Sequence, residues 1–222
     1  MSTCLAHRGP DDEGSWTDDD VGLALGHRRL SILDLSPEGH QPMASVAGRY
    51  VTVYNGEVYN WRELRAELER AGHTRWRGHS DTEVLLAGFE RWGIRGTLDR
   101  ANGMFAIAVW DRQSKQLHLC RDRLGEKPLY YGWSRGVFLF GSELKGLRAH
   151  PAWDGAIDRG ALTAYMRFGY VPAPYTIHAG IRKVPPGSVI TLDARAGVRR
   201  GEDAVTLATF WSVRDAARRA AS

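Results

Sequence analysis

The pattern of hydrophobic and polar residues predicts more strands than helices, with no internal repeat. Residues 50–54 are β-branched or aromatic, which is typical of a strand. Asn55-Gly56 follows, and residues 57–59 then read as the return strand of a hairpin with a type I′ turn. Residues 21–26 alternate weakly between apolar and polar and lead into a predicted strand at 27–33.

Two helices are predicted next, each with its own start signal. Asn60, with Glu63 three residues later, begins the first helix, and Gly72 ends it. Ser80 begins the second helix in the same way, and Gly93 ends it. The apolar faces of the two helices are Trp61, Leu64 and Leu68 in the first, and Leu85, Gly88, Phe89 and Trp92 in the second.

Beyond residue 100 the pattern predicts hairpins, short helices and a closing strand. The predicted elements are strands at 104–110 and 116–120, strands at 128–133 and 137–140, a short helix after Ser142, a helix at 158–168 capped by Asp158, and a strand at 189–192. Antiparallel strands with helices between and after them predict an α+β fold. We expect one domain over residues 1–211, and a solvated tail or the start of a linker over 212–222.

Composition and charge are those of an ordinary globular chain. The 222 residues are 43% hydrophobic and 25% charged, and the formal net charge is +4, which excludes a disordered or charge-driven linker. Of the 30 basic residues only four are Lys, so an Arg-rich surface accounts for the pI of 9.2 better than a nucleic-acid-binding face does. No apolar run reaches membrane-spanning length and no signal peptide begins the chain. These features predict a cytoplasmic protein that binds neither nucleic acid nor a membrane.

No metal site is predicted either. Cys4 and Cys120 are far apart and form no C-x-x-C pattern, and the eight His residues have no ligand spacing.

Six sequence blocks, in order, resemble the N-terminal glutamine amidotransferase domain of glutamine-hydrolysing asparagine synthetases. They are His-Arg-Gly-Pro-Asp at 7–11, His-Arg-Arg-Leu-Ser-Ile at 27–32, Asn-Gly-Glu-Val-Tyr-Asn at 55–60, Ser-Asp-Thr-Glu-Val at 80–84, Gly-Met-Phe-Ala at 103–106 and Arg-Asp-Arg-Leu-Gly-Glu-Lys-Pro-Leu-Tyr-Tyr at 121–131. The resemblance runs from about Leu5 to Trp211.

The resemblance implies an N-terminal-nucleophile (Ntn) hydrolase fold, in which two antiparallel sheets lie between helical layers. It also implies a reaction in asparagine biosynthesis: hydrolysis of glutamine to glutamate and ammonia. In the family the ammonia passes to an ATP-dependent synthetase domain, normally on the same chain, which activates aspartate. The resemblance therefore implies ATP and Mg²⁺ only on that domain and no cofactor on this chain, and it leaves a homodimer open.

The resemblance also assigns glutamine-binding residues. Arg29 matches the arginine that pairs with the α-carboxylate, and Ile32 lines the same pocket. Asp81 matches the carboxylate that binds the α-ammonium. Asn55 and Gly56 match the oxyanion hole, where an amide side chain and a backbone N–H stabilise the negative charge of the tetrahedral intermediate. Glu57 matches a residue beside the substrate.

Each of these residues also has an ordinary structural interpretation. Asn55-Gly56 could form only a turn, and Asp81 could only place charge at a helix N-terminus. Arg29 could be a surface residue. For Arg121-Asp122-Arg123 we favour a structural ion-pair cluster over a site.

The family's nucleophile is an N-terminal cysteine, and the sequence has no match to it. That cysteine lies a few dozen residues before the block that starts here at His7, so we expect the first strand of the fold to be absent. Nor does any Ser-Gly-Gly-x-Asp-Ser loop of a synthetase domain occur. We therefore expect the chain to bind glutamine but to be inactive alone. The alternative is a catalytically dead module that senses glutamine or docks to a synthetase.

Overall fold

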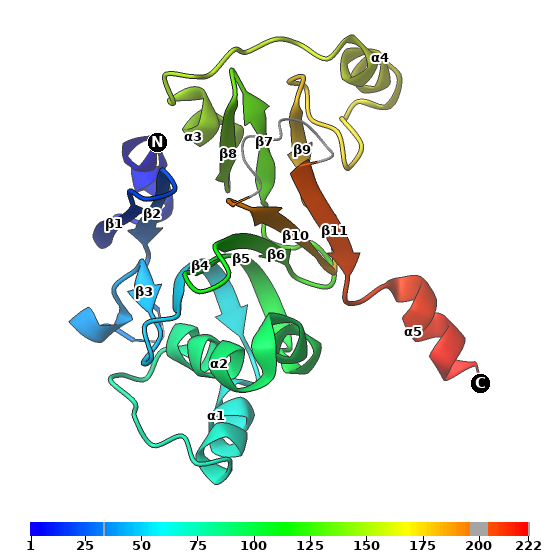
Figure 1. Ribbon diagram of the computed structural model, residues 1–222. Coiled ribbons are helices and arrows are strands. Elements are labelled where there is room, and N and C mark those ends of the chain that lie inside the picture. Colours follow the sequence, from blue (N-terminus) through cyan, green and yellow to red (C-terminus); the bar gives the residue numbers. More distant parts are fainter. Residues whose placement is uncertain (33, 196–203, 222) are drawn as a thin grey trace.

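The computed structural model describes residues 1–32, 34–195 and 204–221 and has an α+β fold (Figure 1). Its central layer is an antiparallel sheet in the order β11-β10-β6-β5-β4-β3. The strands are β3 (Met43–Ala44), β4 (Tyr50–Val58), β5 (Gly103–Asp111), β6 (Gln116–Arg121), β10 (Ser188–Asp193) and β11 (Val205–Thr209).

Helices cover one face of this sheet. They are α1 (Trp61–Arg70) and α2 (Asp81–Arg100), which lie together beneath β4 and β5 in Figure 1. A hydrophobic core fills the space between helices and sheet, and it includes Leu64, Leu85, Phe89 and Ile107. Gly93 leaves the helical conformation, so α2 contains a kink where the sequence predicts its end.

Two smaller sheets cover the other face. One is the hairpin of β1 (Asp12–Asp18) and β2 (Leu23–Arg29), and the other has the order β8-β7-β9. Its strands are β7 (Tyr130–Ser134), β8 (Val137–Gly141) and β9 (Ile181–Lys183). A second core around Leu25, Val53, Trp110 and Leu119 joins them to the central sheet.

The expected second helical layer is small. It consists of α3 (Leu144–Arg148), which packs on β8, and α4 (Arg159–Phe168), which buries only Ala161. Two 3-10 helices, η1 (Ser2–Arg8) and η2 (Pro37–Gly39), complete the described elements before α5. No helix among the described residues is both long and apolar enough to cross a membrane.

Most predicted elements from residue 60 onward are confirmed. The hairpins β5–β6 and β7–β8 pair as predicted, and the side chain of Asp158 caps α4 through a 2.9 Å bond from the N–H of Ala161. Ser80 caps α2 by accepting the N–H of Glu83. Asn60 precedes α1 but makes no capping bond, because its amide side chain instead joins Arg100 O and Asn102 N.

The predicted turn at Asn55-Gly56 is wrong. β4 runs without a break from Tyr50 to Val58, and Asn55 and Gly56 pair with Ala106 and Phe105 of β5. Gly56 is required by the close approach of the two strands, since a Cβ there would lie 2.1 Å from the carbonyl oxygen of Met104. Long-range pairing with a strand about 50 residues later therefore overrides the local turn preference.

The predicted strand at 27–33 also differs from the structure. β2 begins earlier, at Leu23, and ends at Arg29. The chain then leaves the sheet at Leu30, and Leu33 lies outside the described residues. The strand ends at Arg29 because β1, its partner, begins there: Asp12 pairs with Arg29.

The C-terminal segment contains a helix that the sequence analysis does not predict. α5 (Val213–Ala220) has no buried residue and projects from the body in Figure 1. Ser212 caps the N-terminus of α5, because its side chain accepts the N–H of Asp215. The solvated character predicted for this segment fits the exposure of α5, and the boundary at residue 211 stays a prediction. Ser222 lies outside the described residues.

Candidate active site

Three of the residues assigned by resemblance are consecutive on β4. Asn55 faces a cavity of about 700 Å³ between the central sheet, β2 and β8. Its amide nitrogen Nδ2 is buried and has no hydrogen-bond partner among the described residues. A buried amide donor without a partner is costly, so Nδ2 is positioned to bind an acceptor that enters the cavity.

Gly56 offers a second donor beside it. Along β4 the even-numbered residues direct their N–H and C=O groups away from β5. Tyr50 O accepts the N–H of Ser45 on that side, and Val58 N donates to Asp81 there. The two-residue period of a strand puts the Gly56 N–H on the same edge, which β3 leaves open beyond Thr52. No strand pairs with this edge at Gly56, and no other described group accepts the Gly56 N–H.

Asp81 is the first residue of α2 and is fixed to the same strand. Its Oδ2 atom accepts the Val58 N–H at 2.9 Å and the Tyr54 O–H at 2.7 Å. Asp81 is 5% exposed, and this burial raises the pKa of its carboxyl despite the two hydrogen bonds.

Arg29 lies at the end of β2, and carbonyl oxygens orient its guanidinium. Nη1 donates to Ser36 O at 3.0 Å, and Nη2 donates to Asp34 O. Each terminal nitrogen carries two N–H groups, so the fork keeps donors that can face a carboxylate. Gly39 packs against the guanidinium, because a Cβ at Gly39 would lie 1.9 Å from Nη2.

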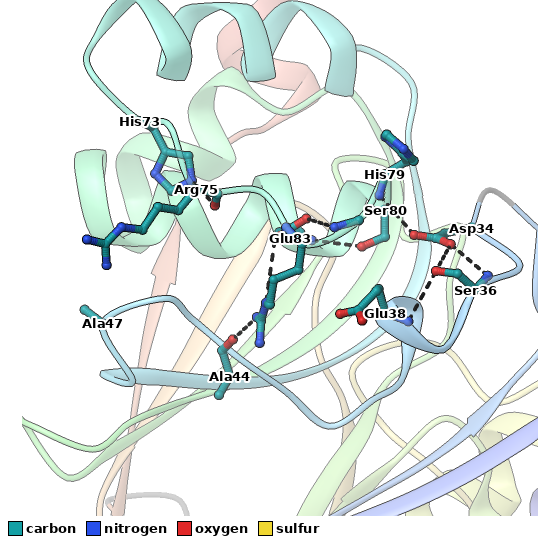
Figure 2. A network of polar contacts seen from close by, with 12 residues as sticks. Asp34, Ser36, Glu38, Ala44, Ala47, His73, Arg75, His79, Ser80 and Glu83 are labelled. Atoms are coloured by element: carbon teal, nitrogen blue, oxygen red, sulfur yellow. Dashed lines mark hydrogen bonds and ion pairs between the residues drawn. The ribbon is translucent and has the colours of Figure 1, made fainter.

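The loop after β2 joins Arg29 to the start of α2. Figure 2 shows Asp34 between the turn at Ser36 and the chain at His79. Asp34 Oδ1 accepts the Ser36 hydroxyl at 2.6 Å, and Oδ2 accepts the His79 N–H at 3.0 Å. Burial acts to raise the pKa of Asp34, but these bonds outweigh it and leave that pKa below its usual value.

Glu83 fixes the next part of this loop. Its two carboxylate oxygens accept the N–H groups of Arg77 and Gly78, at 2.7 and 3.0 Å (Figure 2). Arg29 is therefore linked through Asp34 to the backbone at His79, two residues before Asp81. The two carboxylates that hold this loop, Asp34 and Glu83, are both buried.

Ile32 and Glu57 are less closely integrated. Ile32 is 59% exposed in the loop after β2, and Glu57 is half-buried on β4. Asn55 and Gly56 are neighbours on β4, Asp81 bonds Tyr54 and Val58 on either side of them, and Arg29 is attached through the loop after β2. Of the residues assigned by resemblance, only Asn55 lines the cavity.

The two cysteines lie away from this arrangement. Cys4 is exposed in η1 and Cys120 is buried in the helix-side core, and neither lines the cavity. Burial raises the pKa of the Cys120 thiol far above its usual value, so it is held as an unreactive thiol. In the described part of the chain, no three His, Cys, Asp or Glu side chains form a group that could hold a metal ion.

Asp122, at the centre of the Arg121-Asp122-Arg123 cluster, is structural. It is fully buried and accepts four backbone N–H groups, those of Phe105, Leu124, Glu126 and Lys127. Arg121 donates to the carbonyl oxygens of Gly125 and Lys127 in the same segment and to that of Val184 after β9. The pair thus holds the loop after β6, a structural role as expected, but through backbone groups rather than the expected ion pairs, since none is described among these three residues.

Sequence reasoning missed the residues that hold Tyr54. The Tyr54 N–H donates to Gln41 Oε1 at 2.6 Å, and the Tyr54 carbonyl accepts a bond from His27 Nε2 at 3.0 Å. One signal for His27 was available, because it lies two residues before Arg29 and a strand places such residues on one face. No local signal connects Gln41 to β4.

Comparisons with known proteins show the family to which the chain belongs. A family model described as a glutamine amidotransferase domain matches residues 1–202. The chain is 38% identical to glutamine-hydrolyzing asparagine synthetase 3 of Bacillus subtilis over 216 residues, which is 96% of this chain and 33% of that protein. Asparagine synthetase 1 of the same organism is 42% identical over 192 residues, covering 86% of this chain and 29% of that protein. The chain thus spans about a third of the length of these relatives.

A solved structure shares the fold. The glutamine phosphoribosylpyrophosphate amidotransferase of Bacillus subtilis, in complex with ADP and GMP, superposes with a TM-score of 0.56 at 20% identity. The match covers 85% of this chain and 35% of that one. The α+β arrangement of this chain is therefore that of the Ntn-type amidotransferases.

Proposed function

Because the chain belongs to the family of glutamine amidotransferase domains, we propose that it is the glutamine-binding, ammonia-releasing part of an asparagine synthetase. In this reaction water adds across the C–N bond of the side-chain amide, so glutamine gives glutamate and ammonia. The pair of donors at Asn55 Nδ2 and Gly56 N–H carries the proposal, since neither has an acceptor among the described residues.

The roles of the other residues follow from their chemistry. The Arg29 fork binds the α-carboxylate of glutamine, and the buried Asp81 carboxylate binds its α-ammonium. Asn55 and Gly56 donate to the amide oxygen, whose charge grows in the tetrahedral intermediate. Glu57 and Ile32 lie beside the bound glutamine. The nucleophile is a cysteine thiolate at the N-terminus of the active form, with its own α-amine as base.

The partner of the site is an ATP-dependent synthetase domain that receives the ammonia. ATP and Mg²⁺ belong to that domain, and this chain needs no cofactor for amide hydrolysis. We place the protein in the cytoplasm, where glutamine and ATP are both present. The proposal includes no oligomeric state.

Calorimetry tests the glutamine-binding part of this proposal. We expect glutamine to bind the 222-residue chain, and Arg29→Gln and Asp81→Asn each to weaken binding at least tenfold. Arg91→Gln, at an exposed position of α2, is the matched control and should bind as the unchanged chain does. A chain that binds no glutamine contradicts the proposal.

A second candidate is a module that binds glutamine without hydrolysing it. It is favoured by one observation, that neither described cysteine lines the cavity beside Asn55. To distinguish the two, the N-terminal segment of a relative, beginning with Met-Cys, is fused ahead of the chain. Release of ammonia by the fusion, and its loss on changing that Cys to Ala, supports the amidotransferase. Binding without release by the fusion supports the module.

A further inference from the structure

His27 joins the strand that carries Arg29 to the strand that carries Asn55. On β2, Leu25, His27 and Arg29 share one face by the two-residue period, and Leu25 is packed in the core with Val53 of β4. The ring of His27 reaches β4 and contacts the Tyr54 carbonyl oxygen at 3.0 Å. That carbonyl belongs to the peptide group whose nitrogen is Asn55 N.

The chemistry of this contact fixes the state of the ring. A carbonyl oxygen only accepts hydrogen bonds, so His27 Nε2 carries the proton and donates it. Burial lowers the pKa of His27 to about 4, and the ring is therefore neutral near pH 7. Its other nitrogen, Nδ1, is then bare, buried and without a partner among the described residues.

The edge of β4 explains why a side chain is needed here. β3 pairs with only Val51 and Thr52, so the outward N–H and C=O of Tyr54 have no neighbouring strand. Gln41 Oε1 accepts the N–H, and His27 supplies the donor for the carbonyl. These two side chains replace the missing ladder bonds immediately before the Asn55-Gly56 pair.

We propose that His27 is a positioning residue for glutamine, whose Nε2–H holds the Tyr54–Asn55 peptide group at a fixed distance from Arg29. This inference rests on the proposed function. Arg29 would bind one end of glutamine and Asn55-Gly56 the other, so both act on one molecule only if β2 and β4 keep their spacing. A displacement of about 1 Å between such groups is enough to cost on the order of a hundredfold in a reaction.

Two conservative variants distinguish a donor held at the position of Nε2 from a polar side chain of any length at residue 27. The amide nitrogen of Gln reaches the place of His27 Nε2, whereas that of Asn is too short and matches Nδ1. We expect His27→Gln to bind glutamine within about threefold of the unchanged chain, and His27→Asn to bind it at least tenfold more weakly by calorimetry. His118→Asn, which changes another half-buried His whose ring bonds Thr191, is the matched control and should not alter binding.

An NMR measurement tests the contact without any substrate. In ¹⁵N spectra of the 222-residue chain, the His27 ring should be in the Nε2–H form between pH 6 and 8, with Nδ1 unprotonated. A Nδ1–H form overturns the inference. So does equal binding by the Gln and Asn variants, whether both retain affinity or both lose it. If the unchanged chain binds no glutamine while the Nε2–H form is observed, the proposed function fails and the His27–Tyr54 contact stands.

Discussion

Tyr54 donates its phenolic O–H to Asp81 Oδ2 across 2.7 Å, which joins the centre of β4 to the first residue of α2. The carboxylate assigned to the substrate ammonium is thereby held by the residue that precedes the assigned oxyanion donors. Both groups are buried. The bond therefore contributes to the stability of the chain as well as to the geometry of the proposed site.

Removing the hydroxyl tests this bond. Tyr54→Phe should lower the free energy of unfolding by about 1–2 kcal/mol, because the Asp81 carboxylate loses a buried donor. Urea denaturation at pH 7 measures it. Tyr59→Phe is the matched control, since Tyr59 follows the same strand and is 54% exposed, and it should change stability by less than about 0.5 kcal/mol. Equal midpoints for the two variants would show that the Tyr54 bond adds nothing.

Gly39 controls the position of the Arg29 guanidinium. In Gly39→Ala the new Cβ would meet Nη2 at 1.9 Å, and the flexible end of Arg29 must move aside. We expect glutamine affinity to fall at least tenfold while the free energy of unfolding falls by less than about 1 kcal/mol. Calorimetry and urea denaturation on one sample measure both quantities. Gly146→Ala, whose Cβ would make ordinary contact with Leu5, should leave both unchanged.

The Asp122 carboxylate should be among the strongest polar contributors to stability. Asp122→Ala leaves four buried backbone N–H groups without their acceptor, and we expect a loss of about 2–4 kcal/mol in the free energy of unfolding. Asp99→Ala is the control, because its ion pair with Arg95 is exposed and such pairs contribute less than about 1 kcal/mol. A loss no larger than that of the control would contradict the structural role of Asp122.

Local patterns were sufficient wherever the pairing partner is near in sequence. The β5–β6 hairpin, the Ser80 and Asp158 caps and the apolar faces of both long helices follow from residues within a few positions of each other. The strands β1, β3, β9 and β11 were not predicted. Each pairs at an edge of a sheet, and β3 has only two residues, too few for an alternating pattern.

The same limit applies to the site. Asn55-Gly56 has the strongest local turn signal in the chain, yet pairing with β5 keeps both residues in the extended conformation of a strand. The contacts of Tyr54 with His27, Gln41 and Asp81 span 13 to 27 residues, and no periodicity encodes them. Resemblance to family motifs was therefore enough to identify the candidate site residues. The side chains that hold those residues in place could be identified only from the folded structure.

The buried His27 ring should make the chain sensitive to mild acid. The pKa of His27 is about 4 in the folded chain and near 6.5 when exposed, so the folded state binds fewer protons between these values. Its contribution to stability is fully present above pH 6.5 and is lost as the pH falls toward 4, by about 2 kcal/mol between pH 7 and pH 5. His27→Gln keeps the Nε2-like donor but cannot titrate, so its free energy of unfolding should fall less over this range.

Urea denaturation at pH 7 and at pH 5 measures the difference. The control is His79→Gln, since the His79 side chain is exposed and only its backbone N–H bonds Asp34. That variant should lose as much stability on acidification as the unchanged chain. If His27→Gln does so too, the His27 ring is not buried as a neutral donor, and the contact with Tyr54 must be formed differently in solution.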